Sequence, residues 1–372
     1  VAAASTISLG TVKRADAQAP RAAAGDVKLI KNTCTHCSVG CTVTAEVVNG
    51  VWTSQEPTFE SPINLGAHCA KGAAIREVCV GERRLKYPMK MEGGRWVRMS
   101  WDQAINEIGD KMLKIRETSG PDAIYWLGSA KFTNEGAYWF RKYAAFWGTN
   151  NVDHQARICH STTVTGVGQT FGYGAMTNSY NDIQNSRSIF LIGSNAAEAH
   201  PVSLLHMLRG KENNNAPFIV CDPRFTRTAA HATEHVRMRP GTDVALIWGI
   251  LWHTFQNGWE DKEFIRQRVY GFDDVRKEVA KYTPAEVERI TGVPGAQLRR
   301  VAQTLANNRP FTIIWCMGGT QHTHGTAQVR AYCNLGLAHG TIGTSGGGAN
   351  IYRGHCNVQG ATARGADRAV SK

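Results

Sequence analysis

The 372-residue sequence lacks any run near 18 consecutive apolar residues, so no membrane span is predicted from it. It also lacks a G-x-G-x-x-G motif and a P-loop, which leaves the usual dinucleotide and nucleoside-triphosphate interpretations without direct support. No block of basic residues is interleaved with aromatics, although the formal net charge is +12. A nucleic-acid partner is therefore not indicated. The charge suits an anionic cofactor and a small anionic substrate better.

The composition, 42% hydrophobic and 19% charged, is that of a soluble globular protein, and the length predicts two or three domains. Residues 1–26 differ from the rest because they are rich in alanine and contain no aromatic side chain. They include two overlapping A-x-A-like elements between Ala15 and Ala19, and the chain begins with Val1. This segment is interpreted as the trailing part of an export signal, with a disordered linker as the alternative.

Four of the ten cysteines, Cys34, Cys37, Cys41 and Cys69, are spaced C-x2-C-x3-C-x27-C. Thiolates are soft ligands that select zinc or an iron–sulfur cluster over hard cations. Structural zinc sites more often use two paired C-x2-C knuckles, so an iron–sulfur cluster is the preferred interpretation. Zinc and unrelated or disulfide-bonded cysteines are the alternatives. The other six show no second cluster pattern, and most are predicted to be small core residues.

Strands and helices alternate after the cysteine region. A capping box at Ser100 and Gln103 starts a helix that stops at Gly120, and another helix is predicted at 134–146. Helices are also predicted at 243–255 and after Thr283. Continuous apolar runs predict buried parallel strands, at 188–192, 217–221 and 311–315, besides a short strand at 123–127. This pattern predicts doubly wound α/β domains.

Ligands of such folds bind at the carboxyl ends of the strands. The turns after the first two buried runs carry amide, carboxylate and guanidinium groups, at Gly193, Asn195, Glu198, Asp222 and Arg224. These groups suit the phosphates, ribose and base of a nucleotide. Ordinary turn chemistry and helix capping are the alternative.

A cysteine stands next to a histidine at Cys159 and His160, with Arg157 nearby. This is a candidate low-pKa thiolate with an adjacent proton acceptor; a structural cysteine and a surface histidine are the alternative. Far downstream, a glycine-rich loop leads to Arg353 and His355. A guanidinium there is able to hold a carboxylate through two hydrogen bonds, whereas the alternative is a flexible loop with a solvated arginine.

Together these stretches, from about residue 30 to about 362, resemble the catalytic α subunit of formate dehydrogenases in the molybdopterin-dependent oxidoreductase (DMSO reductase) superfamily. The resemblance rests on several motifs in one order. They are the cysteine pattern with C-A-K-G at 69–72, R-I-C-H at 157–160, C-D-P-R at 221–224, R-P-G-T-D at 239–243, M-G-G-T-Q at 317–321 and R-G-H at 353–355.

The resemblance implies a role for each matching residue. The four cysteines would bind a [4Fe–4S] cluster, and Lys71 would lie on the electron path between the cluster and a pterin. Cys159 would ligate molybdenum or tungsten held by two molybdopterin guanine dinucleotides. His160 would accept a proton, and Arg353 would anchor formate beside His355. The dinucleotide cradle would comprise Gly193, Asn195, Glu198, Asp222, Arg224 and Asp243. Met317 and Gln321 would line the active site or the pterin.

The resemblance also implies a domain plan. Residues 27–80 would form the cluster domain, 81–154 the first part of one α/β domain, and 155–355 the dinucleotide-binding domain. Residues 356–372 would begin a return segment that completes the first α/β domain. Family members are about twice this length, and their C-terminal β-barrel domain is not represented. The sequence is therefore interpreted as a fragment, a truncated product or one chain of a split enzyme. Alone, it is expected to bind the cluster without oxidising formate.

Two other functions are considered. One is a periplasmic nitrate reductase-like enzyme, which the Cys159-His160 pair and the R-G-H stretch disfavour. The other is a non-catalytic iron–sulfur electron-transfer module. By resemblance, the expected partners are an iron–sulfur β subunit and a membrane cytochrome b subunit. The A-x-A elements favour a periplasmic location, with the cytoplasm as the alternative.

Overall fold

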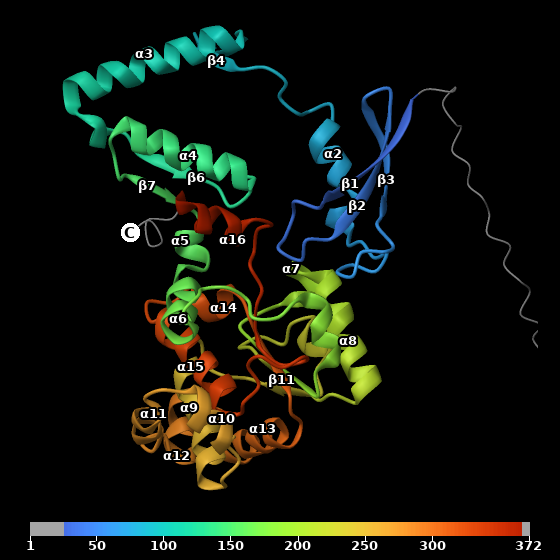
Figure 1. Cartoon of the computed structure of the whole chain (residues 1–372), viewed down its shortest axis with the longest axis vertical. Helices are drawn as coiled ribbons and strands as arrows, with labels where there is room; N and C mark the ends of the chain where they lie inside the picture. Colours follow the sequence, from blue (N-terminus) through green and yellow to red (C-terminus); the bar gives the residue numbers. More distant parts are fainter. Residues whose placement is uncertain (1–25, 367–372) are drawn as a thin grey trace, which may run out of the picture.

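The computed structural model describes residues 26–366 (Figure 1). The predicted export-signal remnant at 1–26 lies outside the described residues apart from Asp26, and so does the end of the predicted return segment, 367–372. None of the helices within the described range is long and apolar enough to cross a membrane.

The first described unit is a three-stranded antiparallel sheet in the order β1-β2-β3. Asn49 and Gly50 connect the second and third strands with φ values of 50° and 81°, as a two-residue hairpin turn requires. The loop from Cys34 to Cys41 joins the first two strands. The elements are β1 (Val27–Thr33), β2 (Thr42–Val48), β3 (Val51–Pro57), α1 (Ala70–Ala73) and α2 (Ile75–Val80).

A second unit follows, drawn at the upper left of Figure 1 around α3 and α4. The predicted capping box is present, since the Gln103 amide donates to Ser100 Oγ at 3.1 Å and the Ser100 amide donates to Gln103 Oε1 at 2.9 Å. The predicted strand at 123–127 is shorter and later than expected. The elements are β4 (Met89–Glu92), β5 (Arg95–Arg98), α3 (Trp101–Ser119), η1 (Pro121–Ala123), β6 (Trp126–Gly128), α4 (Asn134–Trp147) and β7 (Val152–His154).

The main sheet has five strands, all parallel, in the order β10-β9-β8-β11-β12. The predicted buried runs form three of them, with the bounds of β8 and β11 as expected. The chain winds outward in one direction through β9 and β10 and then in the other through β11 and β12. The strands are β8 (Ser188–Ile192), β9 (Phe218–Cys221), β10 (Glu234–Val236), β11 (Phe311–Trp315) and β12 (Ala349–Ile351).

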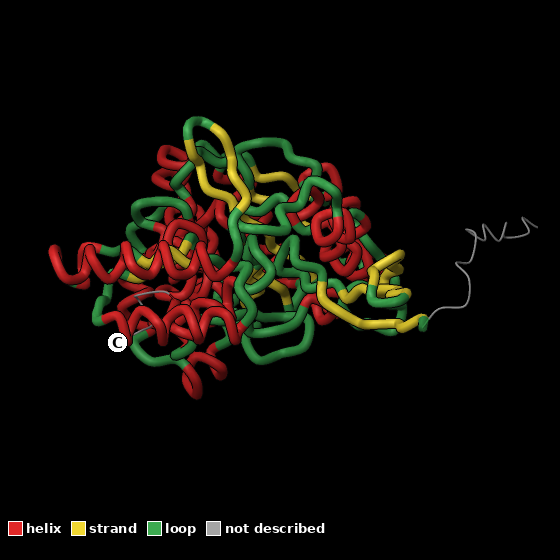
Figure 2. Tube along the Cα trace, turned by 90° about the horizontal axis from the view of Figure 1, so that it is seen from above, coloured by secondary structure: helices red, strands yellow, loops and turns green. Residues whose placement is uncertain are grey.

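Side chains of successive strand residues enter two separate cores, one on each face of this sheet. One core packs against α9, α13 and α15, and the other against α8 and the cysteine loop. Figure 2 shows helices on both sides of the strands. The doubly wound α/β prediction is confirmed. The remaining helices are α5 (Ala156–Cys159), α6 (Ser161–Phe171), η2 (Tyr180–Asn185), α7 (Ala196–Ala199), α8 (Pro201–Asn214), η3 (Ala229–His231), α9 (Asp243–Gln256), α10 (Lys262–Arg268), α11 (Phe272–Val279), α12 (Pro284–Thr291), α13 (Gly295–Asn307), α14 (Met317–Thr320), α15 (Gly325–Ala338), α16 (Val358–Ala361) and η4 (Thr362–Ala366).

Candidate active site

The four predicted cluster cysteines line one small cavity, although Cys69 comes from a different segment than the other three. The amide of Cys34 donates to the carbonyl of Cys41 at 2.8 Å and closes the loop between β1 and β2. Cys69 occupies the N-cap position of α1, without a capping hydrogen bond from its side chain. A Cβ at Gly72 would lie 3.9 Å from Cys34 Sγ, so Gly72 forms the wall of the cavity beside this thiol.

Burial raises the pKa of the Cys34 and Cys37 thiols, and it raises the pKa of Cys41 to about 12. These thiols are therefore protonated at neutral pH, and metal binding releases their protons. No carboxylate lines the cavity, which suits soft cations. Within residues 26–366, no three His, Cys, Asp or Glu side chains are arranged around a single-ion position. A four-iron cube does not need that arrangement, because each iron takes its own cysteine.

Lys71 links the cysteine domain to the main sheet. Its Nζ donates to the carbonyl of Glu198 in α7 at 2.9 Å. That helix follows the turn after β8, so Lys71 lies between the cysteine cavity and the carboxyl edge of the sheet.

The carboxyl ends of β8 and β11 meet where the strand order reverses, which is where doubly wound folds bind ligands. Gly193 follows β8 with a φ of 62°, and its carbonyl accepts a hydrogen bond from the Gly318 amide at 3.0 Å. A Cβ at Gly193 would lie 2.3 Å from the amide nitrogen of Gly319. The two turns therefore touch backbone to backbone, and side chains are excluded between them.

The predicted cradle residues lie in two groups along this edge. Asn195 Nδ2 donates to Glu198 Oε2 at 2.6 Å, and Thr228 Oγ1 donates to Asn195 Oδ1 at 2.8 Å. In the next turn, the Arg224 amide donates to Asp222 Oδ1 at 2.8 Å. The Asn195–Glu198 and Arg224–Asp222 bonds are local contacts, as the alternative interpretation expected, whereas the Thr228–Asn195 bond joins two separate turns. They place the polar groups at the ligand-binding edge, and a cofactor role for them stays a prediction.

Asp243 is the buried member of the predicted cradle, with 2% of its surface exposed. Tyr332 donates to its Oδ1 at 2.6 Å and Gln328 to its Oδ2 at 3.0 Å, and burial raises its pKa. Sequence reasoning missed both partners. The signal available was their i,i+4 spacing, which puts them on one face of α15.

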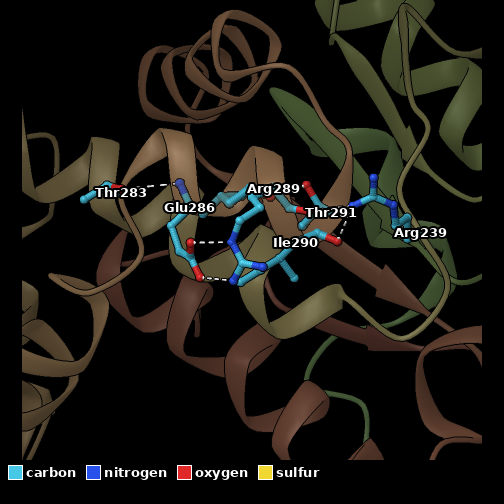
Figure 3. Close-up of polar contacts among 7 residues, drawn as sticks. Arg239, Thr283, Glu286, Arg289, Ile290 and Thr291 are labelled. Atoms are coloured by element: carbon cyan, nitrogen blue, oxygen red, sulfur yellow. Dashed lines mark hydrogen bonds and ion pairs between the residues drawn. The ribbon is translucent and has the colours of Figure 1, made fainter.

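The segment that leads into Asp243 is fixed by a helix terminus (Figure 3). Arg239 donates from Nη1 to the carbonyls of Arg289 and Ile290, at 2.6 and 2.9 Å. These carbonyls end α12, where a cation also interacts favourably with the helix dipole. At the other end, α12 begins after Thr283 as the sequence predicted, and Thr283 Oγ1 accepts from the Glu286 amide.

Cys159 ends α5 and is 5% exposed. Its Sγ would lie 3.7 Å from a Cβ at Gly354, and its carbonyl accepts from Thr320 Oγ1 at 2.8 Å. The expectation of a lowered thiol pKa is wrong for the described chain. Burial raises the pKa of Cys159, and the Gly354 amide and the Arg353 charge offset only part of that effect.

His160 is fully buried, so the alternative of a surface histidine is also wrong. Its Nδ1 lies 3.0 Å from Thr163 Oγ1, and its Nε2 lies 4.0 Å from Cys316 Sγ. Burial first, and then the charge of Arg353, hold the pKa of His160 well below its ordinary value. The imidazole is therefore neutral at physiological pH.

Arg353 follows β12 and is 5% exposed. Its Nη2 donates to the Gly174 carbonyl and to Gln359 Oε1, both at 2.8 Å. Its Nη1 is buried and has no partner among the described residues. Burial lowers the pKa of Arg353 to about 10, which still leaves a cation at neutral pH. A buried cation with a free donor and no paired carboxylate is a site for an anion.

The remaining predicted residues, Met317, Gln321 and His355, differ in how they lie relative to Cys159 and Arg353. The thioether of Met317 would meet a Cβ at Gly354 at 3.8–3.9 Å, so it lies beside the Cys159 thiol. Gln321 donates to the carbonyl of Ile158 at 2.8 Å. His355 instead has its Nδ1 3.2 Å from Gln155 Nε2. No hydrogen bond found among the described residues joins His355 to Arg353.

Two family descriptions match the chain. "Molybdopterin oxidoreductase" matches residues 84–371, and "Molybdopterin oxidoreductase Fe4S4 domain" matches residues 27–80.

The chain belongs to the molybdopterin oxidoreductase family. This membership gives it two cofactors, a molybdopterin and a [4Fe–4S] cluster. The residues present fit both groups. The cysteine cavity offers soft thiol ligands and no carboxylates. The C-terminal ends of the sheet strands offer a backbone contact between two turns that excludes side chains, a buried thiol and an unpaired guanidinium nitrogen.

Relatives of this molybdopterin oxidoreductase include formate dehydrogenase subunits. The α subunit of F420-dependent formate dehydrogenase 1 from Methanococcus maripaludis is 37% identical over 92% of this chain and 50% of its own length. Formate dehydrogenase H from Escherichia coli is 37% identical over 91% of this chain and 48% of its own length. The chain thus spans about half the length of these relatives.

The fold is similar to that of a solved structure, the acetylene hydratase of Pelobacter acetylenicus. It superposes with a TM-score of 0.73 at 26% identity, covering 84% of this chain and 44% of its own. The fold of the molybdopterin oxidoreductase is therefore shared with an enzyme whose name states a different reaction. Function must be argued from the site.

Proposed function

We propose that this chain carries the formate-oxidising centre of a formate dehydrogenase α subunit, which converts formate to CO2 and passes electrons to the [4Fe–4S] cluster. The observation that carries the proposal is the buried Arg353, which has an unpaired Nη1 and whose positive charge acts on the Cys159 thiol. A small carboxylate is an anion that such a guanidinium binds through charge-assisted hydrogen bonds.

The chain's own residues divide the remaining tasks. Cys159 supplies the thiolate ligand for molybdenum or tungsten, and Arg353 holds the substrate anion next to it. Gly193, Asn195, Glu198, Asp222, Arg224 and Asp243 hold the two guanine dinucleotides, with Met317 and Gln321 lining the centre. When bound, the metal–pterin group accepts the two electrons. Cys34, Cys37, Cys41 and Cys69 bind the cluster, and Lys71 lies on the electron path to it.

His160 is the proposed proton acceptor. Its neutral form leaves a ring nitrogen with a lone pair, which is the form a base requires. Burial and the charge of Arg353 lower its pKa, so an accepted proton is passed on readily. His355, whose Nδ1 lies 3.2 Å from Gln155 Nε2, completes the proposed catalytic set beside Arg353.

Partners and location belong to the same proposal. Electrons leave the cluster to an iron–sulfur β subunit and from there to a membrane cytochrome b subunit. The A-x-A-like elements of the N-terminal segment favour export to the periplasm. These assignments rest on the resemblance and on that segment.

The test is formate-dependent dye reduction by the complete α subunit that contains this chain, purified with molybdopterin and cluster, because the chain alone is expected to bind the cluster without oxidising formate. Cys159→Ser is expected to abolish turnover while the cluster absorbance remains. Cys333→Ser is the matched control, because Cys333 is an equally buried cysteine within α15, and it should retain turnover. The proposal fails if the holoprotein does not reduce dye with formate, or if Cys159→Ser turns over like the parent.

A further inference from the structure

Two histidines line the four-cysteine cavity, and neither has a role so far. They are His36, between Cys34 and Cys37, and His68, directly before Cys69. In each ring the Nε2 atom is buried and has no hydrogen-bond partner among the described residues. A buried polar atom without a partner has lost its hydrogen bonds to water without replacing them, so two such atoms at one cavity require an explanation.

The position of His68 is fixed by the start of α1. A Cβ at Gly72 would lie 3.6 Å from Cδ2 of His68 and 3.9 Å from Cys34 Sγ. The ring carbon next to the unpaired Nε2 and a cluster-binding thiol therefore flank the same point. His36 approaches the cavity from the loop between β1 and β2, on a different segment. Two chain segments thus each bring an imidazole to the same enclosed space.

The residues that line the cavity indicate which hydrogen-bond acceptor the two imidazoles lack. Among the residues that line it, His36 and His68 alone carry side-chain N–H donors; the others are cysteines, glycines and apolar residues. No carboxylate or hydroxyl lines the cavity to accept those protons. The acceptors that belong there are the sulfur atoms of the [4Fe–4S] cluster and its thiolates.

We propose that His36 and His68 donate their Nε2–H groups to sulfur atoms of the cluster and thereby set its reduction potential. Reduction adds one electron to the cluster and makes its sulfurs more negative, with no bond formed or broken at the histidines. A hydrogen-bond donor stabilises the reduced state more than the oxidised state and raises the potential. The two histidines thus act on the reduction potential of the cluster. This role does not depend on which substrate supplies the electrons.

The experiment is an EPR-monitored redox titration of the 372-residue chain with its cluster assembled anaerobically. His36→Phe and His68→Phe remove the donors and keep a ring in place. Each is expected to disfavour reduction by roughly tenfold, which is about 59 mV downward for a one-electron couple. His36→Gln and His68→Gln retain an N–H donor and should recover part of that shift.

His253→Gln is the matched control. His253 lies in α9, in the opposite core, and also has a buried Nε2 without a partner, but no cysteine cavity beside it. Its substitution should leave the potential unchanged. Iron and sulfide analysis shows whether each variant holds an intact cluster.

A second readout covers variants that fail to hold the cluster. Pulsed EPR of the reduced parent chain, made with 15N-labelled histidine, should show hyperfine coupling to imidazole nitrogen. That coupling should weaken in each Gln variant. The proposal is overturned by unchanged potentials in the Phe variants, by absent imidazole coupling in the parent, or by a chain that takes up no cluster through its four cysteines.

Discussion

The hydroxyl of Tyr180 lies 2.7 Å from the hydroxyl of Ser38, and this hydrogen bond joins the main α/β unit to the cysteine loop. The Tyr180 ring also packs on Tyr352, with ring centroids 5.0 Å apart. Tyr352 directly precedes Arg353. The tyrosine pair therefore fills the space between the loop that carries three cluster cysteines and the strand end that presents the proposed substrate anchor.

Tyr180→Phe should weaken this junction. The substitution removes one hydrogen bond and leaves Ser38 without its partner, which costs about 1 kcal/mol of unfolding free energy. Urea unfolding of the chain measures it. Tyr270→Phe is the control, because Tyr270 is fully exposed, and it should change nothing. An equal stability for Tyr180→Phe and Tyr270→Phe would show that the Ser38 contact contributes nothing.

The buried strands were the most predictable part of the fold. Residues 188–192 and 311–315 are continuous apolar runs, and a strand covered on both faces needs that pattern. Cap signals at Ser100 and Thr283 fixed two helix starts because their bonds are local. The apolar residues of α3 do not mark its buried face, since Ile105 and Ile108 are about 60% exposed.

The site was only partly accessible from the sequence. The order of the motifs predicted that Cys159, His160 and Arg353 belong to one site. It did not predict that all three side chains are buried. Burial is what raises the pKa of Cys159 and lowers that of His160, and it depends on packing from distant segments. The Gly193–Gly318 contact and the Tyr332–Asp243 bond join residues about 90 or more apart in the chain. Spacing alone cannot specify such pairs.

Gly193→Ala should be strongly destabilising. A positive φ costs an alanine roughly 1–2 kcal/mol, and the clash of its Cβ with the Gly319 amide adds to this. We expect a loss of at least about 3 kcal/mol in unfolding free energy. Gly258→Ala separates the two effects, since Gly258 has a φ of 66° and open space around it. Equal losses in the two variants would mean that the β8 and β11 turns separate easily.

Gln359→Glu should interfere with formate binding, if Arg353 is its anchor. Gln359 Oε1 accepts from Arg353 at 2.8 Å, and a carboxylate there would neutralise the cation and compete with the substrate. Loss of one charge-assisted bond predicts at least a roughly tenfold rise in the KM for formate. Gln359→Leu removes the acceptor without adding charge and should have a smaller effect on KM. A KM for Gln359→Glu equal to that of the parent would argue against Arg353 as the anchor.

Acid should destabilise the chain through its buried neutral histidines, and His339 allows a clean measurement. It is 1% exposed, its Nε2 lies 3.2 Å from Thr254 Oγ1, and burial lowers its pKa to about 3. The unfolded chain binds this proton near pH 6.5 and the folded chain does not. Stability therefore falls as the pH drops below about 6.5, by roughly 2 kcal/mol for this group at about pH 5.

Urea unfolding at about pH 7.5 and about pH 5 tests this linkage. His339→Leu should reduce the stability difference between the two pH values by roughly 2 kcal/mol, whatever its effect at neutral pH. His231→Leu serves as the control, because His231 is exposed, and it should keep the parent's pH dependence. Other buried histidines with a lowered pKa contribute in the same direction in both variants and cancel from the comparison; they are His160, His200, His206 and His253. If His339→Leu kept the full acid sensitivity, the ring of His339 would have to gain its proton without leaving the folded core.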